Sequence, residues 1–205
     1  MVENKYLRII DIARREEIFV YEALKDILFN DKITYVGDDV SSGLADIFTD
    51  DLAIGVEVVT CERKVVHKYT EKNKLPINFS MNIKSSKFVS RTSQEKFANY
   101  KSQQDEFYQN IKLSILKKLK LLKQGNYMGT KEIYLCICSV FEEKPYIDIE
   151  RIARIYKEAS LLINENFDMV FLLVNSNLYM ITNEYKFALL EDYKDSKINV
   201  HKIHL

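Results

Sequence analysis

The sequence predicts an α/β fold in which a mixed central sheet is flanked by helices. Short apolar runs of strand length alternate with longer segments whose apolar residues recur at helical spacing. The 205 residues are 47% hydrophobic and 29% charged, which is enough for one domain, residues 1–205, with a substantial core. Only five Gly and two Pro are present, so the composition excludes a disordered or collagen-like chain.

The first half of the chain begins with a helix over about 13–29, where Val20 and Leu24 start an apolar stripe. Three strands follow at 33–36, 44–48 and 53–60, separated by turn-forming Gly, Asp and Ser. The third strand reads AIGVEVVT, an apolar run with one acid, which is typical of a strand buried on both faces.

A polar stretch over 68–93 separates these strands from the next elements, and we interpret it as one long loop. A long helix is expected over about 94–123, because aromatic and aliphatic residues keep a helical stripe until Gly125. A strand at 132–140 completes this part of the chain.

The remaining residues predict a helix over about 148–163 and strands at 168–174 and 178–182. The turn Asn175-Ser176-Asn177 predicts a tight hairpin between the last two strands. The passage from Tyr134 through the helix to Phe171 is expected to be a right-handed parallel crossover.

The formal net charge of zero conceals a strong division along the chain. Residues 1–61 carry 6 basic and 13 acidic side chains, residues 62–123 carry 15 and 5, and residues 124–205 carry 9 and 12. Basic side chains neutralise backbone phosphates and carboxylates hold hard cations, so this division favours a phosphate-binding surface beside a metal site. A set of solvated helix faces is the alternative.

Three acids lie where the apolar pattern predicts burial: Glu17 on the first helix, Asp46 within LADIF and Glu57 within IGVEVV. A buried carboxylate is costly unless it is paired or coordinated. A shared divalent cation such as Mg²⁺ would explain all three acids and would activate water for attack on a phosphodiester. The alternative for each acid is a sheet edge or a nearby Lys or Arg.

This arrangement resembles the PD-(D/E)XK phosphodiesterase superfamily, whose restriction-endonuclease-like αβββαβ core holds its metal with three acids in these places. The resemblance covers about 13–140 and leaves 141–205 as a peripheral helix and hairpin. It implies that Glu17, Asp46 and Glu57 hold Mg²⁺ or Mn²⁺ as catalytic metal ligands.

The family's Lys, two residues after the third acid, is replaced here by Val59. Members of the superfamily move this Lys to another element, which makes Lys101 of the long helix the preferred substitute and Lys64 the alternative. Gln104 and Tyr108 resemble a Q-x-x-x-Y spacing that contacts DNA in some members.

Five lysines of the long helix lie outside or beside its apolar stripe and are expected either to face solvent or to follow a phosphate backbone: Lys112, Lys117, Lys118, Lys120 and Lys123. The expected function is a Mg²⁺-dependent nuclease that hydrolyses DNA, with a homodimer as an open alternative by analogy with nucleases that cut both strands. The other reading is a nuclease-like protein that has lost catalysis and binds nucleic acid or a protein partner.

Several other patterns point to no further chemistry. The odd number of cysteines, Cys61, Cys136 and Cys138, indicates buried thiols of a reducing compartment. The apolar runs are too short to span a membrane, so a cytoplasmic protein is expected. Asp50 and Asp51 are interpreted as turn formers, with an added metal-ligand role as the alternative. The sequence has no Gly-rich phosphate loop and no nucleophile elbow.

Overall fold

The computed structural model describes most of the two halves of the chain but not the polar stretch between them. The described residues are 7–9, 13–37, 43–60, 93–127, 129–139, 147–174, 177–182 and 184–190, with side chains described from 104 onward in the fourth range. Lys64 and Cys61 lie outside them, as does the whole of 61–92.

In the part of the chain that the structure describes, one eight-stranded sheet organises the fold, with its strands side by side in chain order. Four strands come before the long helix and four after it. They are β1 (Leu7–Ile9), β2 (Thr34–Val36), β3 (Ile47–Thr49), β4 (Ile54–Thr60), β5 (Glu132–Ser139), β6 (Met169–Val174), β7 (Asn177–Ile181) and β8 (Phe187–Leu189).

Strand directions divide the sheet into antiparallel flanks and a parallel centre. β3 is antiparallel to β2 and β4, and β7 is antiparallel to β6 and β8. β4, β5 and β6 are parallel, and so are β1 and β2. The predicted mixed α/β sheet is therefore confirmed, as is the parallel pairing of the strands that contain Tyr134 and Phe171.

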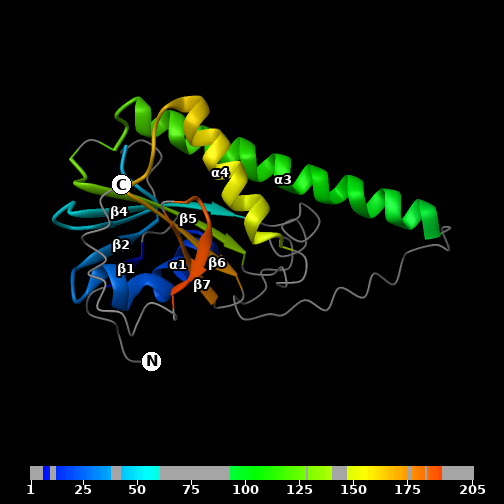
Figure 1. Ribbon diagram of the computed structural model, residues 1–205. Coiled ribbons are helices and arrows are strands. Elements are labelled where there is room, and N and C mark those ends of the chain that lie inside the picture. The colour runs from blue at the N-terminus through cyan, green and yellow to red at the C-terminus, as the bar shows by residue number, and fades with distance from the viewer. Residues whose placement is uncertain are drawn as a thin grey trace.

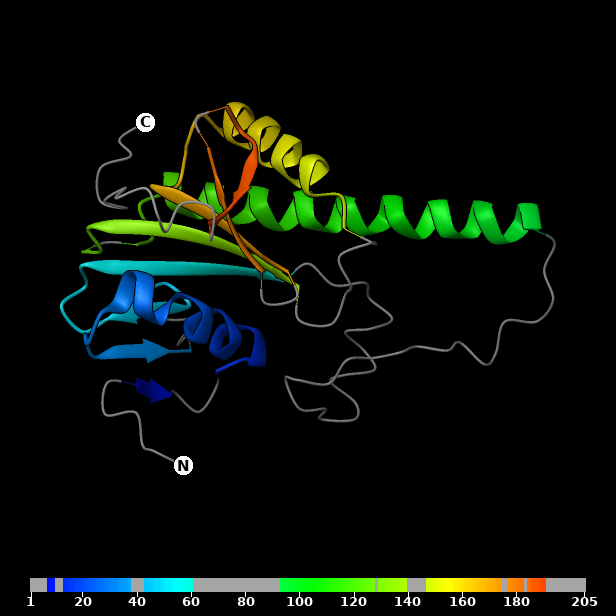
Figure 2. The same ribbon diagram turned by 60° about the horizontal axis from the view of Figure 1, so that its bottom comes forward.

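The helices are α1 (Arg15–Leu24), the π-helical turn η1 (Lys25–Phe29), α3 (Ser93–Lys123) and α4 (Ile149–Ile163). Figure 1 shows α3 and α4 above the sheet and α1 beneath it. In the second view α3 runs as one long rod past the end of the strands (Figure 2). Of the helices that the structure describes, none is both long and apolar enough to cross a membrane.

Two apolar layers hold the helices to the sheet. The α1-side core joins α1 and η1 to one face of the strands, and its central members are Val20, Leu24, Phe29, Ile47, Val56, Val58, Cys136 and Phe171. The α3-side core joins α3 and α4 to the opposite face, and its central members are Val59, Ile111, Ile115, Leu119, Leu135, Ile137, Ile152 and Leu172. Alternate residues of β4 and β5 thus supply both layers.

The structure differs from the predicted elements in one helix and in two additional strands. The expected helix at 13–29 is two elements, because the chain widens from α1 into a π-helical turn and ends at Asn30, whose N–H donates to Lys25 O at 3.1 Å. Strands β1 and β8 were not expected. Each has three residues and lies at an edge of the sheet, so neither builds enough alternation to be recognised.

Cys136 and Cys138 are both fully buried on β5, as predicted. They lie on the α1 side of the sheet among apolar side chains. Burial raises the pKa of the Cys136 thiol well above its ordinary value. Cys136 is therefore a neutral packing group at physiological pH.

Candidate functional site

Glu57 lies in the middle of β4 and is almost completely buried. Its neighbours Val56 and Val58 pack in the α1-side core, whereas Val59 packs in the α3-side core. Because successive strand residues point to opposite faces, the Glu57 carboxylate points toward α3. This placement puts an acid inside an apolar layer.

Asp46 precedes β3 and lies beside Glu57. Its Oδ2 accepts a hydrogen bond from the Val58 backbone N–H at 2.7 Å, which fixes the carboxylate against β4. Like Glu57, it is buried, at 4% exposure. Two acidic side chains therefore lie beside each other in the interior, and repulsion between their ionised forms requires positive charge nearby.

Lys118 of α3 supplies that charge. Its Nζ lies 3.2 Å from Asp46 Oδ2 and also contacts Glu57 Oε2. Ile115 and Leu119, which are fully buried, hold this turn of α3 against the sheet. The ammonium therefore reaches the carboxylates from the side of the sheet that Glu57 faces.

Glu17 joins the site from α1 through Arg14. The Arg14 side chain bonds Glu17 Oε1 through Nε, and its backbone N–H donates to Glu17 Oε2 at 2.8 Å. Arg14 Nη2 lies 3.2 Å from Asp46 Oδ1. Since Glu17 is three residues into the helix, its carboxylate caps the chain at the start of α1.

The electrostatics of the site follow from burial and mutual contact. Burial, and then the Asp46 charge, raise the pKa of Glu57 to about 8, while Lys118 opposes the shift. Burial alone would lower the pKa of Lys118, but Glu57 and Asp46 together raise it. Burial also raises the pKa of Glu17, against its bonds from Arg14. Paired acids with such a shifted pKa are common at functional sites.

The donors available for a divalent cation are the two carboxylates that share Lys118. A single nitrogen touches both Asp46 and Glu57, so one small cation can also reach both. Mg²⁺ is commonly held by one or two carboxylates, with waters and substrate phosphates completing its shell. The pair fits such an ion. Within the described part of the chain, however, no group of three or more potential ligands gathers at one point.

The three predicted acids are thus joined in a chain rather than around one centre. Asp46 and Glu57 share Lys118, while Asp46 and Glu17 share Arg14. Glu17 contacts the Arg14 guanidinium, and its predicted role as a third metal ligand stays a prediction.

The ammonium that contacts Asp46 and Glu57 comes from α3, the helix that contains Lys101, but it belongs to Lys118. Lys118 was expected to lie outside or beside the apolar stripe, and the structure corrects that expectation. Lys101 also belongs to α3, but its side chain is outside the described set, and Lys64 lies in a range that the structure does not describe. Their predicted roles stay predictions.

The position of Lys118 on the helix is a signal that the sequence itself contains. Lys118 follows Ile111 by seven residues and Ile115 by three, so it occupies a stripe position that an apolar residue would normally fill. A lysine at such a position indicates a buried partner of opposite charge. Arg14 has no comparable signal, because it precedes the helical pattern.

The residues proposed to touch nucleic acid lie on α3, and two of them contact α4. Tyr108 is buried, and its hydroxyl accepts a hydrogen bond from the Asp148 backbone N–H at 2.7 Å. Lys112 pairs with Glu158 at 2.9 Å, and Gln104 is partly buried. Tyr108 and Lys112 therefore hold two helices together, and contact of the three residues with DNA stays a prediction.

The acidic turn between β3 and β4 has a structural explanation. Asp51 Oδ1 accepts hydrogen bonds from Thr49 Oγ1 at 2.6 Å and from the Ala53 N–H at 3.0 Å. These bonds lower the pKa of Asp51 to about 2. Asp51 is therefore a turn former, and Asp50 is exposed beside it.

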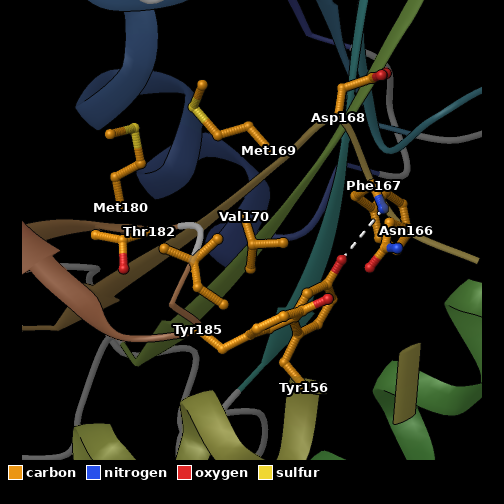
Figure 3. Close-up of a pocket in the computed structure, with 10 residues that line it drawn as sticks. Tyr156, Asn166, Phe167, Asp168, Met169, Val170, Met180, Thr182 and Tyr185 are labelled. Atoms are coloured by element: carbon orange, nitrogen blue, oxygen red, sulfur yellow. Dashed lines mark hydrogen bonds between the residues drawn. The ribbon is translucent and has the colours of Figure 1, made fainter. Parts of the chain in front are cut away.

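A small pocket lies elsewhere in the fold, between the C-terminal part of α4 and strands β6 and β7. Figure 3 shows Tyr156 and Tyr185 at its lower side, with the Tyr156 hydroxyl accepting a hydrogen bond from the Phe167 N–H. The two rings lie 6.4 Å apart. The one carboxylate of its lining, Asp168, accepts a bond from the Ile133 N–H at 2.6 Å and so fixes β5. The tyrosine rings of this pocket pack near each other, and the Tyr156 hydroxyl and the Asp168 carboxylate each accept a bond from a backbone N–H.

Comparison with family models, with curated proteins and with solved structures found no match to the chain.

Proposed function

We propose that this protein is a Mg²⁺-dependent nuclease that hydrolyses DNA phosphodiester bonds, as a divergent member of the PD-(D/E)XK superfamily. The observation that carries the proposal is the contact of the Lys118 ammonium with both Asp46 and Glu57. In metal-assisted phosphodiester hydrolysis, a metal ion held by carboxylates activates water for attack, and a nearby cation stabilises negative charge on the phosphate. The order α1, β2–β3–β4, α3, β5 agrees with the core that the resemblance implies.

In this proposal Asp46 and Glu57 hold the metal, and Mn²⁺ substitutes for Mg²⁺. When bound, such an ion supplies a water of lowered pKa and a Lewis acid at the phosphate. The Val58 N–H keeps Asp46 in place for that role. Arg14 and Glu17 fix the second oxygen of Asp46 from the side of α1.

Lys118 replaces the family lysine whose position is Val59 here. Its stem rises from a buried turn of α3, so the ammonium is held within reach of the space next to both acids. There it stabilises negative charge on the phosphate in the transition state and orients the attacking water. In the hydrolysis the water oxygen bonds to phosphorus while the P–O ester bond breaks. The attacking water gives its proton to solvent, and the departing ester oxygen takes a proton from a second water.

The experiment compares wild type with Glu57→Gln and Lys118→Met on supercoiled plasmid and on linear single-stranded DNA. Reactions contain Mg²⁺, Mn²⁺ or a chelator. We expect cleavage that requires the metal, and a loss of at least about 100-fold in either variant, the scale of one charge-stabilising group. The control is Glu158→Gln, which removes an exposed acid of α4.

Full activity in Glu57→Gln, or equal losses in Glu158→Gln, would contradict the site assignment. Circular dichroism and thermal melts of each variant establish that it is folded. Binding of Mn²⁺ to wild type but not to Glu57→Gln, measured by calorimetry, tests the metal ligands separately from cleavage.

A second candidate is a nuclease-like protein that binds nucleic acid or a protein partner without cleavage. It is favoured by one observation: Lys118 already neutralises the carboxylate pair from within the chain. In that case DNA binding persists in chelator, neither metal supports cleavage, and Mn²⁺ does not bind. Gel filtration with light scattering establishes whether either form is a homodimer.

A further inference from the structure

The most exposed cation of the site is Arg14 rather than Lys118. The Arg14 side chain is 48% exposed, whereas that of Lys118 is 19% exposed and those of Asp46 and Glu17 are 5% and 2% exposed. A molecule that approaches the carboxylates from solvent therefore meets the guanidinium first. This asymmetry gives the two cations different positions in the same site.

Arg14 is also held in a fixed orientation. Its backbone N–H and Nε both bond the Glu17 carboxylate, and its Nη2 faces Asp46. The anchoring residue belongs to the first turn of α1, so the guanidinium is tied to a helix and not to a mobile side chain alone. The Arg14 side chain has therefore already lost, on folding, much of the conformational entropy that a free arginine loses when it binds a ligand.

The guanidinium keeps donors for a further acceptor. Arg carries five N–H donors in a planar fork. Among the described residues its side-chain contacts use Nε and Nη2, so Nη1 is the nitrogen with no acceptor among them. A phosphate oxygen is the acceptor that a guanidinium fork matches best.

We propose that Arg14 binds a phosphate of the nucleic acid next to the one that is cleaved, and thereby positions the strand across Asp46. This inference rests on the proposed function and deepens it by naming a phosphate-binding residue. Lys118, below the acids, acts at the reacting phosphate, while Arg14, at the surface, fixes the strand.

The test measures DNA binding in chelator, so that cleavage plays no part in it. Fluorescence anisotropy of a short labelled DNA, as a duplex and as a single strand, is recorded over a range of salt concentrations. Each phosphate contact contributes about 0.9 to the slope of log K against log salt for a duplex and about 0.7 for a single strand. Arg14→Gln is expected to reduce the slope by one contact, and Arg14→Lys to keep most of it.

The matched control is Lys25→Gln, which removes the same charge from an exposed ion pair with Glu22 next to the other end of α1. It is expected to leave the slope at the wild-type value. An unchanged slope in Arg14→Gln, an equal reduction in Lys25→Gln, or a wild-type protein that does not bind DNA would each overturn the inference.

A second measurement covers the case in which Arg14→Gln does not fold. The Nε–H resonance of Arg14 in wild type, assigned by its absence in Arg14→Lys, is followed by NMR during titration with the same DNA. A shift that saturates with binding is expected, and no shift overturns the inference. If the wild type binds DNA through Arg14 but cleaves none with either metal, the proposed nuclease fails while the phosphate contact stands.

Discussion

The two sides of α3 carry ion pairs of opposite character. Toward the sheet, Lys118 contacts Asp46 and Glu57, whose side chains are at most 5% exposed. Toward α4, Lys112 pairs with Glu158 and Arg151 with Asp105, and these four side chains are 33–63% exposed. One helix thus carries a buried charge cluster and a solvated one within a few turns.

Contact distance alone therefore does not indicate how much an ion pair contributes to stability, because burial differs between the two sides. Exposed pairs contribute from zero to about 1 kcal/mol, because water screens them and their side chains lose entropy. Buried charges pay a large desolvation cost, and removal of one partner leaves the others uncompensated. Asp46 and Glu57 therefore depend on Lys118 in a way that Glu158 does not depend on Lys112.

The largest effect is expected for Lys118→Met above about pH 8, where Glu57 is ionised and the two acids lose the ammonium that they share. The free energy of unfolding should fall there by about 3–5 kcal/mol. Urea unfolding followed by circular dichroism measures it. The neighbouring exposed residue supplies the control, since Lys117→Met should change the same quantity by less than about 0.5 kcal/mol. Equal effects of the two substitutions would mean that the acids do not need Lys118.

Glu57→Gln tests the same cluster through its pH dependence. The ordinary pKa of Glu57 is 4.5 and burial raises it to about 8 in the folded protein. Between these values the folded state holds a proton that the unfolded chain has released, so the free energy of unfolding falls as the pH rises. Gln cannot ionise and keeps the shape of Glu.

Above about pH 8 the Glu57→Gln variant should therefore be more stable than wild type, by about 1–4 kcal/mol. Toward about pH 4.5 the difference should shrink. Thermal melts of both proteins across this range provide the measurement. A stability difference between the two proteins that stays constant across this range would show that Glu57 is ionised throughout.

A neutral contact on the α4 side is expected to have a smaller effect. Tyr108→Phe removes the acceptor of the Asp148 N–H, which precedes the first turn of α4. The loss should be about 1–2 kcal/mol, because a partly buried donor is left without its partner. Urea unfolding quantifies it, and faster amide hydrogen exchange confined to α4 would locate it.

The smallest effect is expected for Lys112→Gln, which breaks the exposed pair with Glu158. The free energy of unfolding should change by less than about 1 kcal/mol, and the change should vanish in high salt. A double-mutant cycle with Glu158→Gln isolates the pair. A coupling as large as that of the Lys118 cluster would remove the contrast between the two sides of α3.

Much of the fold could be predicted from the sequence because the elements are long or strongly patterned. The apolar stripe of α3 is explained by burial against one core layer. The continuous apolar run of β4 is explained by burial on both faces of the strand. Edge strands β1 and β8 could not be predicted, because three residues give too little alternation. The widening of α1 into η1 also has no signal in the spacing of apolar residues.

The burial of the two acids could be predicted from the sequence, but the identity of the cations that contact them could not. Glu57 and Asp46 interrupt apolar runs, and that interruption is visible in the sequence. The residues that neutralise them come from distant segments, 72 positions away for Lys118 and Asp46. Only the packing of α3 on the sheet selects Lys118 from the lysines of that helix, and only the start of α1 brings Arg14 to Asp46.

Because Asp46 takes Arg14 from one face of the sheet and Lys118 from the other, the cluster can assemble only after β3, β4 and both helical layers have come together. Contacts so distant in sequence close large loops and slow the search for the native state. The intact cluster thus reports on completed folding. A refolding intermediate that had formed only one layer would hold its acids without both of their cations.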